Sequence, residues 1–246
     1  MPLKASSDDQ AQLLELQAID TRLQQLDHRV KSLPEIAALA ELTTQVDTVQ
    51  LLIAAANGVV EDARAELGRV ESDVTVVEAR MARDTGRLEA TASLKDVAGL
   101  EIELVGLRKR QTALEEIELE VMERLENLEA AEATRHLEHD ELLSMMVALE
   151  AERDTALGVL ASERTHATAN RATIAGKLPA DLLALYERQR ERYGAGASLL
   201  RGGVSGASGV KLNENDMAVI RVAAPDDVLL CPDSNAILVR TTESGL

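Results

Sequence analysis

An unbroken alternation of three- and four-residue steps between apolar residues dominates the N-terminal half of the sequence. It begins at Leu39, ends at Met81 and holds over twelve consecutive steps. The members are Leu39, Leu42, Val46, Val49, Ile53, Ala56, Val60, Ala63, Leu67, Val70, Val74, Val77 and Met81. A stripe with this period of 3.5 is the a/d seam of a coiled coil. The chain must therefore form a long helix that packs against another long helix.

A shorter seam precedes this one, and a looser seam follows it. The first runs from Leu16 to Leu33, where "SLPE" interrupts it, with Ser32 as a cap and Pro34 in the first turn of the next helix. The looser seam belongs to a second helical stretch that we expect from about Leu94 to Ala175. Its core positions include polar residues, namely Glu118, Glu132 and Arg135.

The connection between the two long stretches has helix caps. Thr91 and Ser93 are good N-caps, and Asp96 follows Ser93 at the spacing of a capping box. The arms on either side of residues 90–96 are each about 80 residues long. Equal arms joined by a short connection favour an antiparallel αα-hairpin within one chain. A parallel homodimer of bent helices is the alternative.

The composition agrees with a coiled coil, and it limits the expected cellular location and the expected classes of partner. The chain has no Phe or Trp, one cysteine and a formal net charge of −17. Such a surface repels phosphate backbones and anionic lipid headgroups. No run approaches the roughly 18–20 apolar residues of a membrane span, and the N-terminus lacks the apolar region of a secretory signal. We therefore expect a cytoplasmic protein that does not bind membranes.

The sequence changes character after the second arm, which divides the chain into three parts. Residues 1–175 form the predicted coiled-coil hairpin, residues 176–203 a short helix and a flexible Gly-rich joint, and residues 204–246 a small β-rich domain. Within that domain, residues 227–241 are typical of a strand, a turn and a second strand. Residues 213–227 predict a short helix that is capped by Asn213 or Asn215 and ends before the proline at 225.

Two short motifs in this domain have the spacing of a metal site without its ligands. Ser205 and Ser208 form one pair, and Cys231 and Ser234 form the other. Two Cys-x-x-Cys pairs in this layout would make a zinc ribbon, which needs four ligands in a tetrahedron. Serine is neutral at pH 7 and is a poor zinc ligand, so Cys231 alone cannot hold the ion. A Gly-rich loop followed by a β-hairpin would explain the same residues.

Nearly the whole chain resembles a bacterial family of coiled-coil hairpin proteins with a C-terminal C4-type zinc ribbon, once classified as a domain of unknown function. The resemblance is carried by "LLELQAIDTRLQQLDHR", "SLKDVAGLEIELVGLRKRQTALEEIELEVMERLE", "LPADLLALYERQR" and "VAAPDDVLLCPDSNAILVRTTESGL", and it fits the actinobacterial branch best. It implies four zinc ligands at positions 205, 208, 231 and 234. Only Cys231 matches, so the resemblance implies a degenerate site without zinc, and no other cofactor is expected.

Four arginines beside the joint form the other candidate site. Arg188, Arg190, Arg192 and Arg201 could contact nucleic acid together with the two tyrosines, Tyr186 and Tyr193, or they could form a salt-bridged helix surface. Proteins of the family that the chain resembles have been implicated in RNA binding and in escorting a sigma factor or secretion and flagellar components. No constellation of catalytic residues is apparent in the sequence.

These observations predict a mainly α fold and a non-enzymatic function. The fold is a long antiparallel coiled-coil hairpin with a small, β-rich, zinc-ribbon-like head. The expected function is that of a scaffold or adaptor that binds partner proteins through the hairpin and the head. The alternative is an RNA- or DNA-binding regulatory protein that uses the basic joint and the head. Whether the chain is a monomer or a homodimer stays open.

Overall fold

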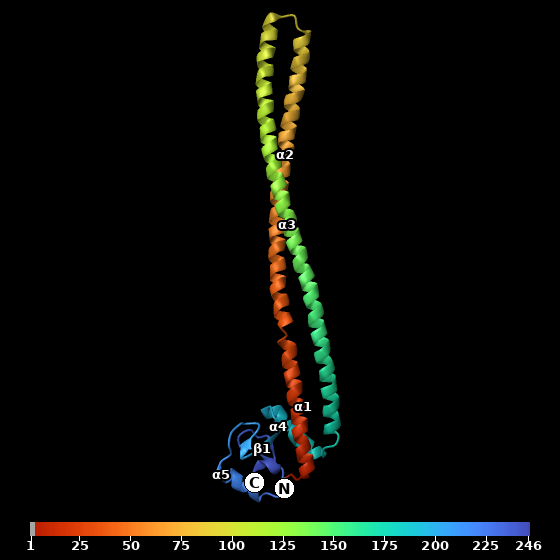
Figure 1. The fold of residues 1–246 in the computed structure, drawn as a ribbon, viewed down its shortest axis with the longest axis vertical. Coiled ribbons are helices and arrows are strands. Elements are labelled where there is room, and N and C mark those ends of the chain that lie inside the picture. The colour runs from red at the N-terminus through yellow and green to blue at the C-terminus, as the bar shows by residue number, and fades with distance from the viewer. Residues whose placement is uncertain (1–2) are drawn as a thin grey trace. The chain divides into compact units, whose positions relative to one another are not determined.

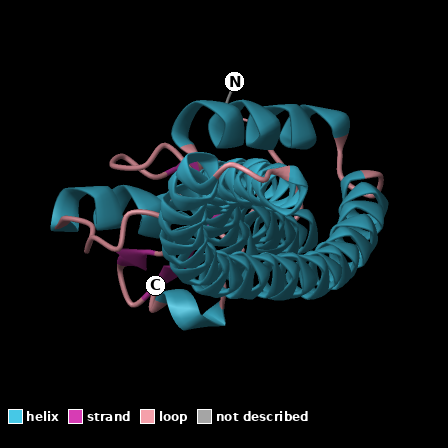
Figure 2. Cartoon of the chain, turned by 90° about the horizontal axis from the view of Figure 1, so that it is seen from above, coloured by secondary structure: helices cyan, strands magenta, loops and turns pink. Residues whose placement is uncertain are grey.

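The computed structural model describes residues 3–246 and divides into two compact units. The first unit, here called the head unit, combines the described residues up to Pro34 with Glu152–Leu246. The second unit, here called the hairpin unit, is Glu35–Ala151. Helix makes up most of the chain, and strand is confined to short segments (Figure 2).

The hairpin unit is built from two long helices that run in opposite directions (Figure 1). Helix α2 spans Pro34–Ala90, and helix α3 spans Leu94–Ala175 and continues into the head unit. Ion pairs join residues that are progressively closer in sequence toward the connection. Arg64 contacts Glu129 at 2.6 Å, and Arg80 contacts Glu103. The pairing is therefore antiparallel and lies within one chain, as predicted.

The predicted seam of α2 lies on the buried side of the helix. Each of its thirteen positions from Leu39 to Met81 is buried or half-buried, and Val60 is only 2% exposed. On α3 the counterparts include Leu100, Leu104 and Val121, which are also buried. The looser seam predicted for this arm is visible too, because Glu118 and Glu132 lie half-buried among its apolar positions.

Of the two caps predicted at the connection, Ser93 caps α3, because its hydroxyl accepts a hydrogen bond from the Asp96 N–H at 3.5 Å. Thr91 does not cap the helix, since its hydroxyl accepts from the Ser93 N–H at 3.4 Å, one residue before α3 begins. Ser32, however, does not cap α2. It is the C-cap of helix α1 (Ser7–Lys31), and its hydroxyl donates to the carbonyl of His28. The prediction for Ser32 was wrong because Pro34 itself begins α2.

The head unit packs helices around a small four-stranded sheet. Helix α1 lies against the last turns of α3, where Arg22 pairs with Glu163 and Asp27 pairs with Arg164, each at 3.1 Å. The remaining helices are α4 (Ala180–Tyr193), α5 (Glu214–Val222) and a 3₁₀ turn, η1 (Thr242–Ser244). The strands are β1 (Ala197–Arg201), β2 (Val204–Ser205), β3 (Leu229–Leu230) and β4 (Ile237–Val239).

The strand order is β2-β1-β4-β3, with β1 and β4 parallel and both outer pairs antiparallel. Period-two alternation gives the sheet two buried faces. One face joins α1 and α4 in a core that contains Leu13, Leu182, Tyr186 and Ile237. The other face, through Leu200 and Leu238, joins α5 and Cys231 in a second core.

The structure corrects one part of the predicted joint. Ala197–Arg201 is not a flexible segment but strand β1, one of the two inner strands of the sheet, and Leu200 is fully buried. The glycine before it is required by close packing, since a Cβ atom at Gly196 would lie 2.4 Å from the Tyr186 ring. Glycine here marks tight packing, which the sequence pattern could not distinguish from flexibility.

One apolar stretch exceeds what we expected from the sequence. An 18-residue window within Ser7–Ala90 has a mean hydropathy of 1.2, which meets the length and composition of a membrane span. Core helices of soluble proteins, which are mostly buried, meet the same test. Only 22% of the window is buried.

Candidate functional site

The first of the two motifs folds into a tight turn at residues 205–210, here called the first knuckle. The Ser205 N–H donates to the carbonyl of Val210 at 3.2 Å, and the Gly209 N–H donates back to the carbonyl of Ser205 at 2.8 Å. The Ser208 hydroxyl accepts a hydrogen bond from the Val210 N–H at 3.2 Å. Gly209 has a φ of 67°, a left-handed conformation that glycine adopts without strain.

The second knuckle, residues 231–236, repeats this geometry bond for bond. The Cys231 N–H donates to the carbonyl of Ala236 at 2.8 Å, and the Asn235 N–H donates to the carbonyl of Cys231 at 2.9 Å. The Ser234 hydroxyl accepts from the Ala236 N–H at 3.4 Å. Asn235, at the position of the glycine in the first knuckle, also has a positive φ, of 57°. Asparagine tolerates this conformation better than most residues.

The two knuckles bring their side chains together around the single cysteine. Ser205 and Cys231 are fully buried, and the Ser205 hydroxyl lies 3.1 Å from that of Ser198. Burial raises the pKa of the Cys231 thiol, but hydrogen bonds from Ser205, Ser234 and nearby backbone outweigh it, so the pKa is lowered overall. The site is thus a hydrogen-bonded cluster of hydroxyls around one thiol.

The donor set does not match zinc. Three of the four positions carry hydroxyls that act as neutral hydrogen-bond partners, and the ion requires thiolate, imidazole or carboxylate ligands. Across residues 3–246, no three His, Cys, Asp or Glu side chains lie in an arrangement that could hold a metal ion. The two turns therefore share one hydrogen-bond pattern, and three of their four motif positions carry hydroxyls where a zinc site would need its ligands.

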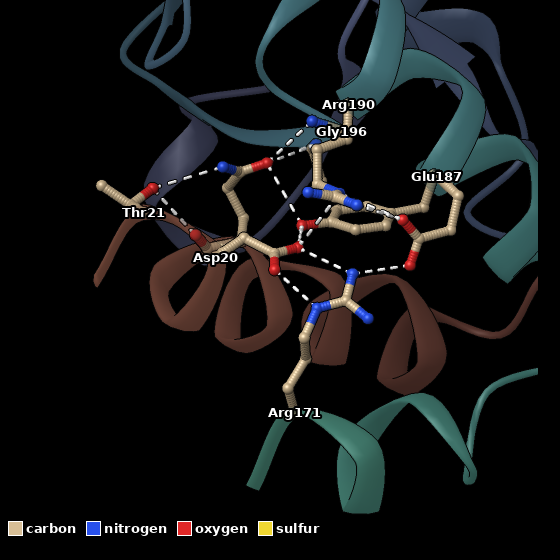
Figure 3. Close-up of polar contacts among 9 residues, drawn as sticks. Asp20, Thr21, Arg171, Glu187, Arg190 and Gly196 are labelled. Carbon is tan, nitrogen blue, oxygen red and sulfur yellow. Dashed lines mark hydrogen bonds and ion pairs between the residues drawn. The ribbon is translucent and has the colours of Figure 1, made fainter. Parts of the chain in front are cut away.

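A polar network in the head unit contains one of the four candidate arginines (Figure 3). Asp20 on α1 is 3% exposed and accepts two hydrogen bonds from Arg171 on α3, at 2.6 and 3.1 Å. It also accepts one from the Tyr186 hydroxyl at 2.7 Å and forms an ion pair with Arg190 at 3.5 Å. Glu187 bridges the two guanidinium groups.

A neighbouring side chain extends this network to the sheet. The Gln17 Oε1 atom accepts hydrogen bonds from the N–H groups of Gly196 and Ala197, at 2.7 and 3.3 Å, just before and at the start of β1. Its amide nitrogen donates to the Thr21 hydroxyl at 3.3 Å (Figure 3). Polar contacts therefore tie α1, α3, α4 and β1 together.

The network shifts the acidity of its members in opposite directions. Burial would raise the pKa of Asp20, but hydrogen bonds from Arg171 and Tyr186 lower it below its ordinary value. Burial, followed by the bond to Asp20, raises the pKa of Tyr186. The hydrogen bond to Asp20 likewise raises the pKa of Arg171. All these shifts favour a charged aspartate and a neutral tyrosine, which suits a structural junction.

The structure does not gather the four candidate arginines into one site. Arg190 is engaged by Asp20 and Glu187, and Arg201 on β1 pairs with Glu243 at 3.2 Å. Arg188 and Arg192 are exposed, and within residues 3–246 neither forms an ion pair. The Arg192 guanidinium lies over the Tyr193 ring, 5.3 Å from its centroid.

Sequence reasoning did not find the partners in this network. Asp20 and Arg171 are 151 positions apart, and nothing in either local pattern indicates that they meet. One usable signal was present, because Asp20 follows the seam residue at 19 on an otherwise core-facing stretch of α1. A charged residue beside a seam indicates that it has an ion-pair partner, but the partner can be named only once the register of the opposing helix is known.

A family model and a relative of known sequence match the chain. The model of the CT398-like coiled coil hairpin domain matches residues 16–194. The Mycobacterium tuberculosis protein Rv2229c is 34% identical over 239 residues, which cover 97% of this chain and 98% of that protein.

Solved structures agree with the architecture. A protein from Mycobacterium smegmatis has a TM-score of 0.87 and 37% identity, and the match covers 97% of this chain and 100% of that one. The CT398 structure from Chlamydia trachomatis has a TM-score of 0.65 over 95% of this chain and 98% of its own. Its identity is 14%, so this second likeness concerns the fold alone.

Proposed function

Because the chain belongs to the family of CT398-like coiled coil hairpin proteins, we propose that it is a non-enzymatic scaffold or adaptor. In this proposal it binds partner proteins through the hairpin and through a ribbon-like head. The observation that carries the proposal is the exposure of large apolar side chains along both long helices. They include Leu51, Val76, Ile102, Leu119, Leu137 and Val147, each at least 60% exposed.

The number of exposed apolar residues along both helices favours a surface that binds proteins over one that only contacts water. Single exposed leucines are ordinary on a protein surface. Helices that carry them along their length, outside the seam, resemble helices that bind further helices. A two-helix hairpin also offers little of the deep, enclosed space that small-molecule sites require.

The head would supply a second and more specific docking module. Its two knuckles keep their turn geometry, while Ser205 and Ser234 hydrogen-bond to the Cys231 thiol. A head that folds in this way needs no ion to present its surface. On α5 that surface includes Val219 and Val222, at 66% and 87% exposed.

Affinity capture with the full chain tests the proposal. The tagged protein is incubated with cell lysate, with and without nuclease, and the retained material is identified by mass spectrometry. We expect one or a few proteins whose recovery does not change with nuclease. Recovery that disappears after nuclease treatment, or the absence of any retained protein, would contradict the adaptor function.

One observation favours the alternative function, an RNA- or DNA-binding regulatory protein. Arg192 and Tyr193 together present an exposed cation and an exposed aromatic ring, the pair that stacks on and neutralises single-stranded nucleic acid. A titration of labelled RNA at several salt concentrations separates the two functions. Submicromolar binding that weakens steeply with salt and is lost in Arg188→Glu/Arg192→Glu would favour the alternative. Arg190 is left intact in this test because it belongs to the buried network.

A further inference from the structure

Helix α2 carries a second stripe beside its seam. Its members have the same four- and three-residue steps, and each precedes a seam residue by one position. They are Glu41, Gln45, Thr48, Leu52, Ala55 and Val59. All six are exposed, whereas the seam residues that follow them are buried or half-buried. Toward its C-terminal end the stripe becomes wholly apolar, with Leu52 44% and Val59 50% exposed.

This stripe forms one wall of a groove between the two helices of the hairpin unit. The groove has a volume of about 480 Å³. Its apolar lining is Val49 and Leu52 from α2 and Leu142 from α3, beside the methyl-bearing Thr44 and Thr48. Helical spacing extends the α3 wall, because Met145 lies seven residues after the lining residue Glu138 and is 56% exposed.

The groove is acidic at its rim and along the helices that form it. Glu41 and Glu138 line it. From residue 35 to residue 63, α2 contains Glu35, Glu41, Asp47, Glu61 and Asp62 but no Lys or Arg. On α3, residues 125–151 contain seven acidic residues and a single arginine, at 135.

From this geometry we propose that the groove of the hairpin unit binds an amphipathic helix of a partner protein that carries Lys and Arg beside its apolar face. An exposed stripe of period 3.5 beside an existing seam is what a third helix requires in order to pack against two. The charge selects the partner, because basic residues would complement the rim and steer the encounter. This inference rests on the adaptor function and names the kind of partner for one of its surfaces.

The same charge argues against two other occupants. A second copy of the chain would bring like charges together, since the same stretches of α2 and α3 are acidic in both copies. The cytoplasmic face of a membrane is anionic and attracts basic rather than acidic helices. The basic helix is the occupant that the surface fits.

A designed peptide tests the proposal on the full chain. The probe is a fluorescein-labelled, three-heptad helix with leucine at positions a and d and lysine alternating with alanine elsewhere. Its twin carries glutamate in place of lysine. Binding is followed by fluorescence anisotropy at physiological salt. We expect the lysine peptide to bind and the glutamate twin to bind at least about tenfold more weakly.

Two neighbouring substitutions locate the binding surface. Leu52→Lys places a charge in the groove and should weaken binding at least about tenfold, whereas Leu51→Lys adds the same charge on the next, 73% exposed side chain and should change it less than about twofold. Circular dichroism checks that both variants keep their helices. Ala55→Lys, on the same stripe, serves in place of Leu52→Lys if that variant unfolds.

Other outcomes would overturn the proposal. Equal losses in Leu51→Lys and Leu52→Lys would reduce the binding to general charge attraction, and absence of binding by the wild type would remove the site. Sedimentation of the chain with phosphatidylcholine vesicles, abolished by Leu52→Lys, would make the stripe a lipid-binding surface instead. Failure here together with nuclease-resistant protein capture would leave the adaptor function standing and assign it to another surface.

Discussion

At the residue scale, the polar network around Asp20 holds the helices of the head unit to its sheet. Asp20 is buried, yet it is paired with two arginines and a tyrosine, which is the condition under which a buried carboxylate is tolerated. Such a cluster is costly when one partner is removed. It fixes α1, α3 and α4 relative to the first strand within the head unit.

Asp20→Asn should therefore destabilise the head unit by about 2–4 kcal/mol, because it leaves Arg171 and Arg190 without their shared carboxylate. Asp27→Asn is the matched control, since Asp27 pairs with Arg164 in solvent, 51% exposed, and should cost at most about 1 kcal/mol. Urea unfolding measures both. Equal costs would contradict a special role for the buried network.

The lowered pKa of Asp20 adds a pH dependence to the same prediction. A carboxyl whose pKa is lower in the folded state stabilises the fold above its unfolded value of about 3.9 and loses that contribution as the pH falls through the folded value. The wild type should thus lose stability more steeply than Asp20→Asn as the pH falls below about 4. Parallel curves for the two proteins would show that the folded and unfolded pKa values do not differ.

The two knuckles lead to a prediction about metal. A structural zinc site contributes roughly 10–16 kcal/mol of apparent folding free energy at neutral pH. With Ser205, Ser208 and Ser234 as hydroxyls, this contribution should be absent. Elemental analysis should find well under one zinc per chain, and a chelator should not change the melting curve. Stoichiometric zinc that is lost together with structure would contradict this.

Restoring the ligands provides the positive control for the metal prediction. Because both knuckles keep the same hydrogen bonds, the triple substitution Ser205→Cys, Ser208→Cys and Ser234→Cys should create a site that binds one zinc per chain. Adding Cys231→Ser to that variant should weaken zinc binding strongly. If the triple variant binds no zinc, the knuckles do not have the geometry that we describe.

At the element scale, α2 has two stripes of residues with the same period, of which one is buried and the other exposed. The seam is covered by α3, and the stripe one position before it is exposed.

Ile53→Asp would bury an unpaired charge in the seam, where Ile53 is 8% exposed. The substitution should cost at least about 3 kcal/mol and lower the melting temperature sharply. Leu51→Asp, on the exposed side, should stay within about 0.5 kcal/mol. Thermal unfolding followed by circular dichroism measures both, and similar losses would mean that the seam is misassigned.

The same contrast explains what the sequence could predict. Periodicity and capping residues are local signals, so they located both long helices, the cap at Ser93 and the burial of the α2 seam. They also found α5 with its cap at Asn213. They failed where packing decides, as at Gly196, where glycine makes room for a tyrosine ring.

The candidate site residues also divide into those that local spacing could find and those that depend on distant partners. Spacing located both knuckles, since four positions and two turns suffice to define them. The arginine cluster was grouped by closeness in sequence, whereas ion pairing separates its members, with Arg190 in a buried network and Arg201 on a strand. Long-range pairing of this kind depends on the register of three helices, which no local pattern contains.

At the scale of the whole molecule, the chain combines a hairpin that has exposed apolar side chains with a head for which we propose no bound ion. Each unit offers its own candidate surface, the groove beside Leu52 in the hairpin unit and the exposed face of α5 in the head unit. Both surfaces are suited to proteins. The strongly acidic composition of the chain, with a net charge of −17, disfavours nucleic acid over most of its area.

Photocrosslinking in cells tests whether these two surfaces bind proteins. A photoreactive amino acid is placed at Leu52, at Val222 or, as a control, at the exposed Asp73 of α2. Adducts are resolved by mass with and without nuclease. The adaptor function predicts discrete protein adducts from Leu52 or Val222 that resist nuclease and are absent from Asp73. Adducts that vanish with nuclease, or that form equally from all three positions, would contradict it.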